Sequence, residues 1–256
     1  MLKKRLIGVV TVKNGWAVQS FGYRRHLPLG KPQWLVENLD RWGADEILVQ
    51  CIDRTASKVG PDFALLQTLA SMGLGTPLIY GGGIASVEQG VKVIQAGADR
   101  IAVDALLHDA PAVVAELGRH LGVQALVAAA PLRMQGDTPV WHDYRARRDR
   151  PLAELNRILL SGLASELLVI DCEHEGQVNG FDTRLLNALP EWNMPLLAFG
   201  GISEVASMQD LLARPRVAAV GVGNFLSYRE LAIQQFKKAV ASAELRAALF
   251  ASDYPN

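Results

Sequence analysis

Residues 77–84 read Pro-Leu-Ile-Tyr-Gly-Gly-Gly-Ile, and residues 195–202 read Pro-Leu-Leu-Ala-Phe-Gly-Gly-Ile. In both segments an apolar run is followed at once by glycines, which is typical of a buried parallel strand that ends in a tight turn. A second pair has a similar spacing, because Ala-Asp-Glu-Ile-Leu-Val at 44–49 returns as Ala-Ser-Glu-Leu-Leu-Val at 164–169. Two matches in the same order, each offset by roughly 120 residues, indicate two similar halves.

Working outward from these repeats, eight short apolar runs alternate with longer amphipathic stretches. The runs predict strands at 5–12, 46–52, 77–80, 100–103, 124–130, 166–171, 195–199 and 218–222. The amphipathic stretches predict helices at 32–42, 63–72, 87–96, 110–121, 152–163, 183–189, 205–212 and 229–240. Eight strand–helix units predict a single α/β domain over 1–256, a (β/α)8 TIM barrel with half-barrels at roughly 1–122 and 123–256. An open doubly wound sheet is the alternative, disfavoured because no Gly-x-Gly-x-x-Gly follows the first strand.

Composition excludes several classes of function. The 256-residue chain carries 26 basic and 26 acidic residues, so it lacks the basic excess of a nucleic-acid or anionic-membrane binder. Only two cysteines occur, so we expect a reducing compartment rather than a disulfide scaffold. The basic N-terminus runs into a strand-like segment rather than a signal-peptide core, and no charge-free apolar stretch is long enough to span a membrane. We therefore expect a cytoplasmic protein.

Glycines follow the third and seventh predicted strands, where the active site of such a barrel lies. Gly82, Gly83, Gly200 and Gly201 would let backbone N–H groups approach an anion, and the helix that follows adds a favourable dipole. Tight turns also use glycine for purely steric reasons. As a symmetric pair, the two turns predict a small-molecule ligand with a phosphate at each end.

A series of short motifs resembles the HisF family, the cyclase subunit of imidazole glycerol phosphate synthase. They are Val-Lys-Asn-Gly at 12–15, Gly-Ala-Asp at 43–45 and 97–99, Gly-Gly-Gly at 81–83, Gly176 with Gly-Phe-Asp at 180–182, and Gly-Gly at 200–201. The resemblance implies a barrel that takes ammonia from a HisH-like glutaminase docked at its bottom and cyclises a bis-phosphorylated substrate. It also places the second phosphate site at Gly176, Gly201, Gly223 and Asn224, and it implies no cofactor.

The chain departs from the family where the family keeps its acid–base groups. Two aspartates, at the ends of the first and fifth strands, fall here on Thr11 and Ala130, and neither replacement is a useful proton carrier. A family lysine falls on Gln19, and Asp104 stands where the family has a phosphate-binding asparagine. Asp53, Asp104 and Asp171 follow strand ends, so they are the candidate replacement catalytic groups, although they are equally suited to capping turns.

The chain retains the charged residues that form the ammonia entrance in the HisF family. Arg5, Glu46, Arg100 and Glu166 each begin a strand and match the ring that forms the ammonia gate in HisF. Ordinary strand-end salt bridges are the alternative for any single member. Asp99 and Gln124 match family positions that face the glutaminase. The resemblance therefore implies a docked partner.

Three weaker signals have simpler readings. The run Asp-Cys-Glu-His-Glu at 171–175 offers metal-ligand types, but adjacent strand residues point to alternating faces, so we expect no metal site. Cys51 has no histidine placed to activate it, so packing is favoured over nucleophilic chemistry. The basic run 145–150 is expected to be a solvated loop.

The leading hypothesis is a HisF-like synthase subunit of a glutamine amidotransferase that conducts ammonia but has lost the cyclase acid–base pair. Relatives organised in this way serve surface-polysaccharide sugar synthesis. The alternatives are an active cyclase of histidine biosynthesis with relocated carboxylates, and a non-catalytic scaffold barrel.

Overall fold

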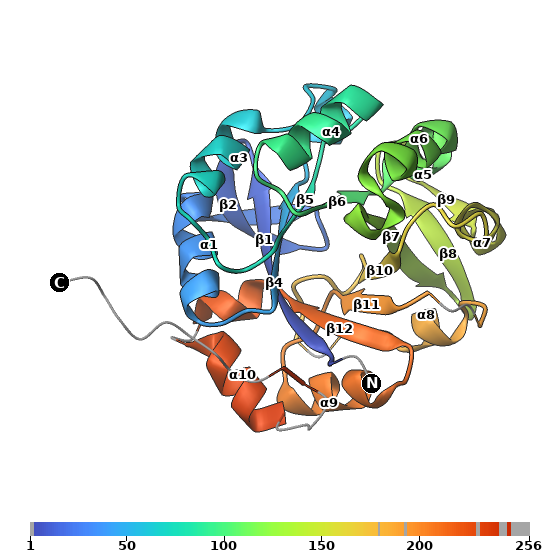
Figure 1. The fold of residues 1–256 in the computed structure, drawn as a ribbon. Coiled ribbons are helices and arrows are strands. Elements are labelled where there is room, and N and C mark those ends of the chain that lie inside the picture. The colour runs from blue at the N-terminus through green and yellow to red at the C-terminus, as the bar shows by residue number, and fades with distance from the viewer. Residues whose placement is uncertain (1–2, 179, 192–193, 229–230, 241–244, 247–256) are drawn as a thin grey trace.

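Eight parallel strands close into a barrel in a computed structural model that describes residues 3–178, 180–191, 194–228, 231–240 and 245–246 (Figure 1). Around the barrel the strands run β1 (Arg5–Lys13), β4 (Glu46–Cys51), β5 (Leu78–Gly81), β6 (Arg100–Val103), β7 (Leu126–Gln135), β10 (Glu166–Asp171), β11 (Leu196–Phe199) and β12 (Val217–Val222). Pairing of β10 with β7, and of β12 with β1, completes the circle. The predicted (β/α)8 TIM barrel is confirmed, whereas the half-barrel boundaries stay a prediction.

Helices cover the outside of the barrel where amphipathic stretches predicted them (Figure 1). They are α1 (Pro32–Arg41), α3 (Phe63–Ala70), α4 (Val87–Gln95), α6 (Pro111–Leu121), α7 (Leu152–Leu159), α8 (Arg184–Asn187), α9 (Val205–Ala213) and α10 (Ala232–Val240), with two short extra helices, α2 (Arg54–Ser57) and α5 (Ala105–Asp109). The start of the last predicted helix, 229–230, lies outside the described residues. Among the helices that the structure describes, none could cross a membrane.

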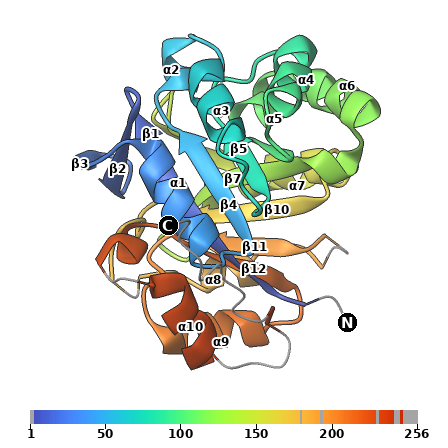
Figure 2. The ribbon, with the colours of Figure 1, turned by 60° about the vertical axis from the view of Figure 1, so that its left-hand side comes forward.

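Two antiparallel hairpins rise from the mouth end of the barrel and were not predicted. After β1 the chain forms β2 (Trp16–Phe21) and β3 (Arg25–Gly30), which Figure 2 shows projecting to one side beside α1. The long strand β7 runs on into β8 (Thr138–Asp143) and β9 (Arg148–Pro151). The expected loop at 145–150 is therefore wrong from Arg148 onward, because its backbone pairs with β8.

The core has two layers that follow the alternation of side chains along each strand. Every barrel strand contributes to the interior cluster, which consists of Ile7, Val9, Leu48, Ile79, Ala102, Val127, Ala129, Leu168, Ile170, Leu197, Phe199 and Ala219. The residues between them point outward and pack against the helices in a larger cluster that includes Val10, Val49, Ala128 and Ala130. The alternation decides which side chains reach the barrel mouth.

At the opposite end, aspartates of the repeated Gly-Ala-Asp motif fasten neighbouring strands together. Asp45 Oδ2 accepts a hydrogen bond from the Leu6 backbone N–H at 2.7 Å, and Asp99 Oδ2 accepts one from the Leu78 N–H at 2.7 Å. Asp45 also pairs with Lys237 of α10 at 2.7 Å, and both side chains are at most 5 % exposed. The motif therefore fixes strand register at the bottom of the barrel.

Candidate functional site

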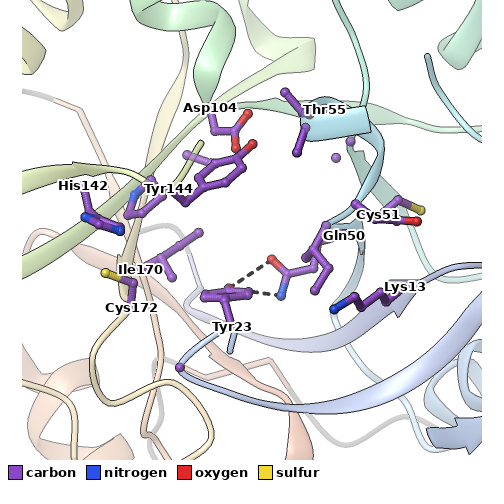
Figure 3. A pocket seen from close by; sticks show the side chains of 18 of the residues that line it. Lys13, Tyr23, Gln50, Cys51, Thr55, Asp104, His142, Tyr144, Ile170 and Cys172 are labelled. Carbon is purple, nitrogen blue, oxygen red and sulfur yellow. Dashed lines mark hydrogen bonds between the residues drawn. The ribbon is translucent and has the colours of Figure 1, made fainter. Parts of the chain in front are cut away.

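A cavity of about 910 Å³ opens at the carboxyl ends of the strands. Its floor is the upper part of the barrel interior, with Leu48, Ala102 and Leu168. Its walls come from the two hairpins and from the segments that follow β4 and β6. Figure 3 shows His142 and Tyr144 on one side of the cavity, with Gln50 and Lys13 on the other. The cavity lies where barrel enzymes keep their active sites.

A neutral hydrogen-bonded chain occupies the mouth of the barrel beside β1. Thr11 Oγ1 accepts a hydrogen bond from Gln50 Nε2 at 2.8 Å, and the Gln50 amide contacts Tyr23 Oη at 3.2 and 3.3 Å. Tyr23 lies at the tip of the β2–β3 hairpin with a φ of 54°, and its ring packs on the interior cluster. Burial raises the pKa of the Tyr23 phenol, so it remains a neutral hydrogen-bonding group.

On the opposite strand, the position that faces the mouth is Pro131. Ala129 and Pro131 line the cavity, whereas Ala130 is fully buried in the cluster between barrel and helices. The assignment of the family's second aspartate to Ala130 is thus corrected, since consecutive strand residues point to opposite faces and the inward ones here are odd-numbered. Proline carries no proton-transfer group, so the mouth still lacks a carboxylate at this point.

The predicted ring forms at the other end of the barrel. Arg5 Nη1 donates to both Glu46 oxygens at 2.9 Å, and Arg100 Nη1 donates to Glu166 Oε2 at 2.6 Å and to Glu46 Oε1 at 3.4 Å. A further bond from Arg5 Nη2 to Glu166 Oε1 closes the ring. Strands β4 and β10 lie on opposite sides of the barrel, so a ring that includes Glu46 and Glu166 crosses the axial opening.

The ring is largely removed from water, with side chains 8–14 % exposed. Burial alone would lower the pKa of Arg5, but the carboxylates of Glu46 and Glu166 outweigh it and raise that pKa. Two cations and two anions neutralise one another, which allows such a group to be buried.

The two predicted partner-facing residues lie at the same end and are exposed. Asp99 uses one carboxylate oxygen on the Leu78 N–H, and the Gln124 carbonyl accepts a bond from Arg100 Nε at 3.1 Å. Asp99 directly precedes the strand that supplies Arg100, and the backbone of Gln124 contacts that arginine.

Comparison with known proteins identifies the family. The model of the family described as histidine biosynthesis protein matches residues 5–232. The chain belongs to the histidine biosynthesis protein family. It is a divergent HisF member: the HisF subunit of imidazole glycerol phosphate synthase from Streptococcus sanguinis is 27% identical over 250 residues, which cover 96% of this chain and 98% of that protein. Those from Exiguobacterium sibiricum and Hyphomonas neptunium are each 30% identical, covering 88% and 95% of this chain and 91% and 97% of the relatives.

Two of the three candidate carboxylates of this HisF-family chain line the cavity. Asp53 follows β4 and accepts a bond from the Asn14 N–H, while Asp104 follows β6 and faces Tyr144 (Figure 3). Asp171 is turned away from the cavity. Its buried carboxylate accepts bonds from the backbone N–H groups of its own loop, at 173, 174 and 182, and contacts the ring of His174 at 2.8 Å. Asp171 therefore acts as a turn cap.

The first predicted phosphate turn of the HisF pattern is partly engaged by the protein itself. Gly82 lines the cavity, but the Gly83 N–H donates to Thr55 Oγ1 at 3.0 Å. A Cβ at Gly83 would lie 2.4 Å from the Gly60 carbonyl oxygen. Close backbone packing thus accounts for Gly83 without a ligand.

In the second predicted phosphate turn, the Asn224 side chain is bonded to the β2–β3 hairpin. The Asn224 amide donates to the Ser20 carbonyl at 2.6 Å and accepts from the Ser20 N–H at 3.1 Å, so both of its ends are occupied. A Cβ at Gly176 would lie 2.1 Å from the same Ser20 oxygen. Like Asn224, the four glycines of this turn do not line the cavity; they are Gly176, Gly200, Gly201 and Gly223. Phosphate binding by this turn stays a prediction.

Neither thiol near the cavity is built for nucleophilic chemistry. Burial raises the pKa of both Cys51 and Cys172 to about 12, so both remain protonated near neutral pH. In the part of the chain that the structure describes, no group of three or more His, Cys, Asp or Glu residues is placed to hold a metal ion. The run at 171–175 instead packs as a loop around Asp171 and Glu175.

Several residues of the cavity were missed from the sequence. Tyr23, Gln50, Arg133, His142 and Tyr144 all line it. Most lie on the two hairpins, whose strands are short and carry no HisF motif. In β8 the consecutive residues Val140 and Trp141 are both buried, so this strand lacks the simple alternation that would have predicted it.

Removing the Thr11 hydroxyl tests the hydrogen bond between Thr11 and Gln50 at the barrel mouth. Thr11→Val keeps the shape but leaves the Gln50 amide without one acceptor, so the free energy of unfolding should fall by about 1 kcal/mol. Thr68→Val is the matched control, because its hydroxyl bonds to Ala64 on an exposed face of α3. Urea unfolding of both variants measures the difference. Equal stability of the two would show that the hydrogen bond to Thr11 adds nothing.

Proposed function

We propose that this chain is the synthase-side subunit of a glutamine amidotransferase. A HisH-like glutaminase would dock at the bottom of the barrel, and ammonia would pass through the Arg5–Glu46–Arg100–Glu166 ring to the cavity. The ring carries the proposal, because four charged side chains from four strands are held across the axial opening with little exposure. Ion pairs that only stabilise the barrel could form separately between neighbouring strands and would not need to cross the axis.

The chemistry of such a ring suits a small neutral amine donor. Each side chain has a partner of opposite charge, so the ring has no net charge to attract or repel ions. Displacing one arginine would open the axis while the other contacts persist. The exposed Asp99 and Gln124 beside the ring provide a polar rim for a docked protein.

The barrel mouth supports a role other than standard cyclisation. Thr11 is tied into a neutral chain with Gln50 and Tyr23, and Pro131 faces it from the opposite strand. Neither residue can exchange a proton near neutral pH. The ammonia acceptor therefore differs from the cyclase substrate, or the acceptor is bound with the help of a further protein.

An active cyclase is the second candidate, favoured by the position of Asp53 and Asp104 in the cavity. The two proposals separate in one assay. The purified chain receives ammonium chloride and the bis-phosphorylated ribulosyl substrate of HisF, and consumption of the substrate is followed. Consumption below about one hundredth of the rate of an ordinary HisF supports the proposal, since each lost acid–base group removes roughly 10²–10⁴-fold. Consumption at ordinary rates contradicts it.

Docking of the glutaminase is tested at Gln124. In a copurification with the HisH-like glutaminase of the same genome, Gln124→Arg should weaken binding about tenfold, which corresponds to about 1.4 kcal/mol. The matched control is Gln67→Arg on the exposed face of α3, which should bind as the unchanged chain does. Stimulated glutamine hydrolysis in the complex provides the second readout. Failure of the unchanged chain to bind any such glutaminase would favour a scaffold role instead.

A further inference from the structure

A histidine on the β8–β9 hairpin faces the cavity and is oriented by a carboxylate. His142 and Asp149 lie directly opposite each other in the β8–β9 register, and His142 Nδ1 is 2.9 Å from Asp149 Oδ1. Arg133 of β7 holds the same carboxylate with two bonds, from Nε at 3.0 Å and from Nη2 at 2.5 Å. Arg133, Asp149 and His142 thus form a hydrogen-bonded triad. Its imidazole lies at the wall of the cavity, where Figure 3 shows His142.

The triad determines which imidazole nitrogen carries the proton. Hydrogen bonding by Arg133 lowers the pKa of Asp149, so this carboxylate is ionised and can only accept hydrogen bonds. His142 Nδ1 must therefore donate, and in the neutral ring the lone pair resides on Nε2. Within the described residues, no hydrogen bond reaches Nε2, and the ring is about a fifth exposed along the cavity wall.

Three other side chains of the cavity that could carry a proton are His26, Cys172 and Tyr144. His26 Nδ1 lies 3.1 Å from Lys13 Nζ, whose ammonium can only donate, so the lone pair of His26 is already used. Cys172 donates its thiol proton to the Leu132 carbonyl. Burial, together with Asp104, raises the pKa of Tyr144, so its phenol is a poor base. The carboxylates of Asp53, Asp104 and Glu173 also line the cavity, whereas His142 offers an imidazole base whose orientation is fixed by Asp149.

We propose that His142 is the proton-transfer residue of this cavity, with Asp149 and Arg133 as positioning residues, acting on a carbonyl compound that accepts ammonia. The proposal rests on the ammonia-conducting function proposed above. It relocates the acid–base role from the end of β7, where Pro131 stands, to the hairpin that continues the same strand. Anionic groups on the acceptor would meet the cations at the rim of the cavity, Lys13, Arg24 and Arg147.

His142 alone can carry out both proton transfers of imine formation. The ammonia lone pair forms a C–N bond at the carbonyl carbon, and the carbonyl π electrons move to oxygen. His142 Nε2 takes a proton from the cationic nitrogen and returns it to the alkoxide. A second proton transfer from nitrogen to oxygen by the same ring releases water as the C=N bond forms. The net change converts ammonia and a carbonyl into an imine and water.

The test uses the full chain with ammonium chloride and D-ribose 5-phosphate, a phosphorylated carbonyl probe. Cyanoborohydride traps the imine as an amine, which mass spectrometry quantifies. His142→Gln should lower the protein-dependent rate about 10²-fold, and added imidazole should restore part of it. Asp149→Asn should lower it less. The matched control, His120→Gln, replaces an exposed histidine of α6 and should leave the rate unchanged.

A long-range ¹H–¹⁵N spectrum gives a readout that is independent of rate. At a pH where the rings are neutral, His142 should show the Nδ1–H form, and Asp149→Asn should shift it toward Nε2–H. An Nε2–H ring in the unchanged chain, no protein-dependent amination, or a His142→Gln rate within twofold of the unchanged chain would each overturn the proposal. No glutaminase is present in these experiments, so failed docking with intact amination would remove the amidotransferase proposal alone.

Discussion

Replacement of Asp45 by alanine is expected to lower the free energy of unfolding by about 3–5 kcal/mol, the cost of breaking one buried ion pair. Asp45 accepts bonds from Lys237 and from the Leu6 N–H, and both side chains of the ion pair are almost inaccessible to water. The change leaves the Lys237 ammonium buried without this carboxylate. It also removes the hydrogen bond from the Leu6 N–H of β1 to the segment before β4. Chemical unfolding in urea, followed by circular dichroism, measures the loss.

Two further variants separate the contributions at Asp45. Asp45→Asn keeps an acceptor for the Leu6 N–H but removes the negative charge. The free energy of unfolding that Asp45→Asn loses therefore measures the contribution of the ion pair. Glu37→Ala breaks an exposed pair with Arg41, 2.7 Å long, and should cost at most about 1 kcal/mol. If Asp45→Ala lowered the free energy of unfolding no more than Glu37→Ala does, the buried ion pair would not stabilise the fold more than an exposed one.

Gly200→Ala is expected to prevent stable folding or to cost about 2–6 kcal/mol. A Cβ there would lie 2.4 Å from the Asp171 carbonyl oxygen, and the φ of 112° is strained for any residue with a side chain. Overpacking and an unfavourable backbone conformation each contribute about 1–3 kcal/mol. The three nearest atoms are all backbone atoms of Asp171, so relaxation requires movement of β10. Thermal unfolding and the yield of soluble protein are the measurements.

The control for Gly200 is a glycine with a positive φ but free space. Gly136, at the β7–β8 turn, has a φ of 61°, and a Cβ added there would meet no atom within 4 Å, so Gly136→Ala should cost only about 1–2 kcal/mol. Gly82→Ala, whose Cβ would lie 2.5 Å from the Cys51 carbonyl oxygen, should behave as Gly200→Ala does. Equal losses at Gly136 and Gly200 would contradict the steric explanation.

The barrel could be predicted because its signals are local. Each strand is a short buried run bounded by glycine or charge, and the repeats at 77–84 and 195–202 mark the same structural position twice, as the near-identical contacts of Gly82 and Gly200 indicate. The ring could also be predicted, since Arg5, Glu46, Arg100 and Glu166 all begin strands. Parallel strands bring their starts together without any further information.

The cavity could not be predicted to the same extent. Its walls depend on how two hairpins fold back over the mouth, and the pairing of His142 with Asp149 is set by a β8–β9 register that no local pattern reveals. The assignment to Ala130 failed by one residue because the alternation of a nearly all-apolar strand cannot be read from its sequence. Asn224 looked like a ligand-binding side chain until the structure placed Ser20 of β2 against it.

The cavity walls and the barrel differ in what a substitution costs. The two apolar clusters that stabilise the fold consist mainly of residues from the barrel strands and the helices, and the hairpin strands add only Ala17 and Trp141 to the buried members described. Changes elsewhere in the hairpins can therefore accumulate with little loss of stability. A chain built in this way can exchange one small-molecule partner for another during evolution, while its entrance for the shared nitrogen donor stays the same.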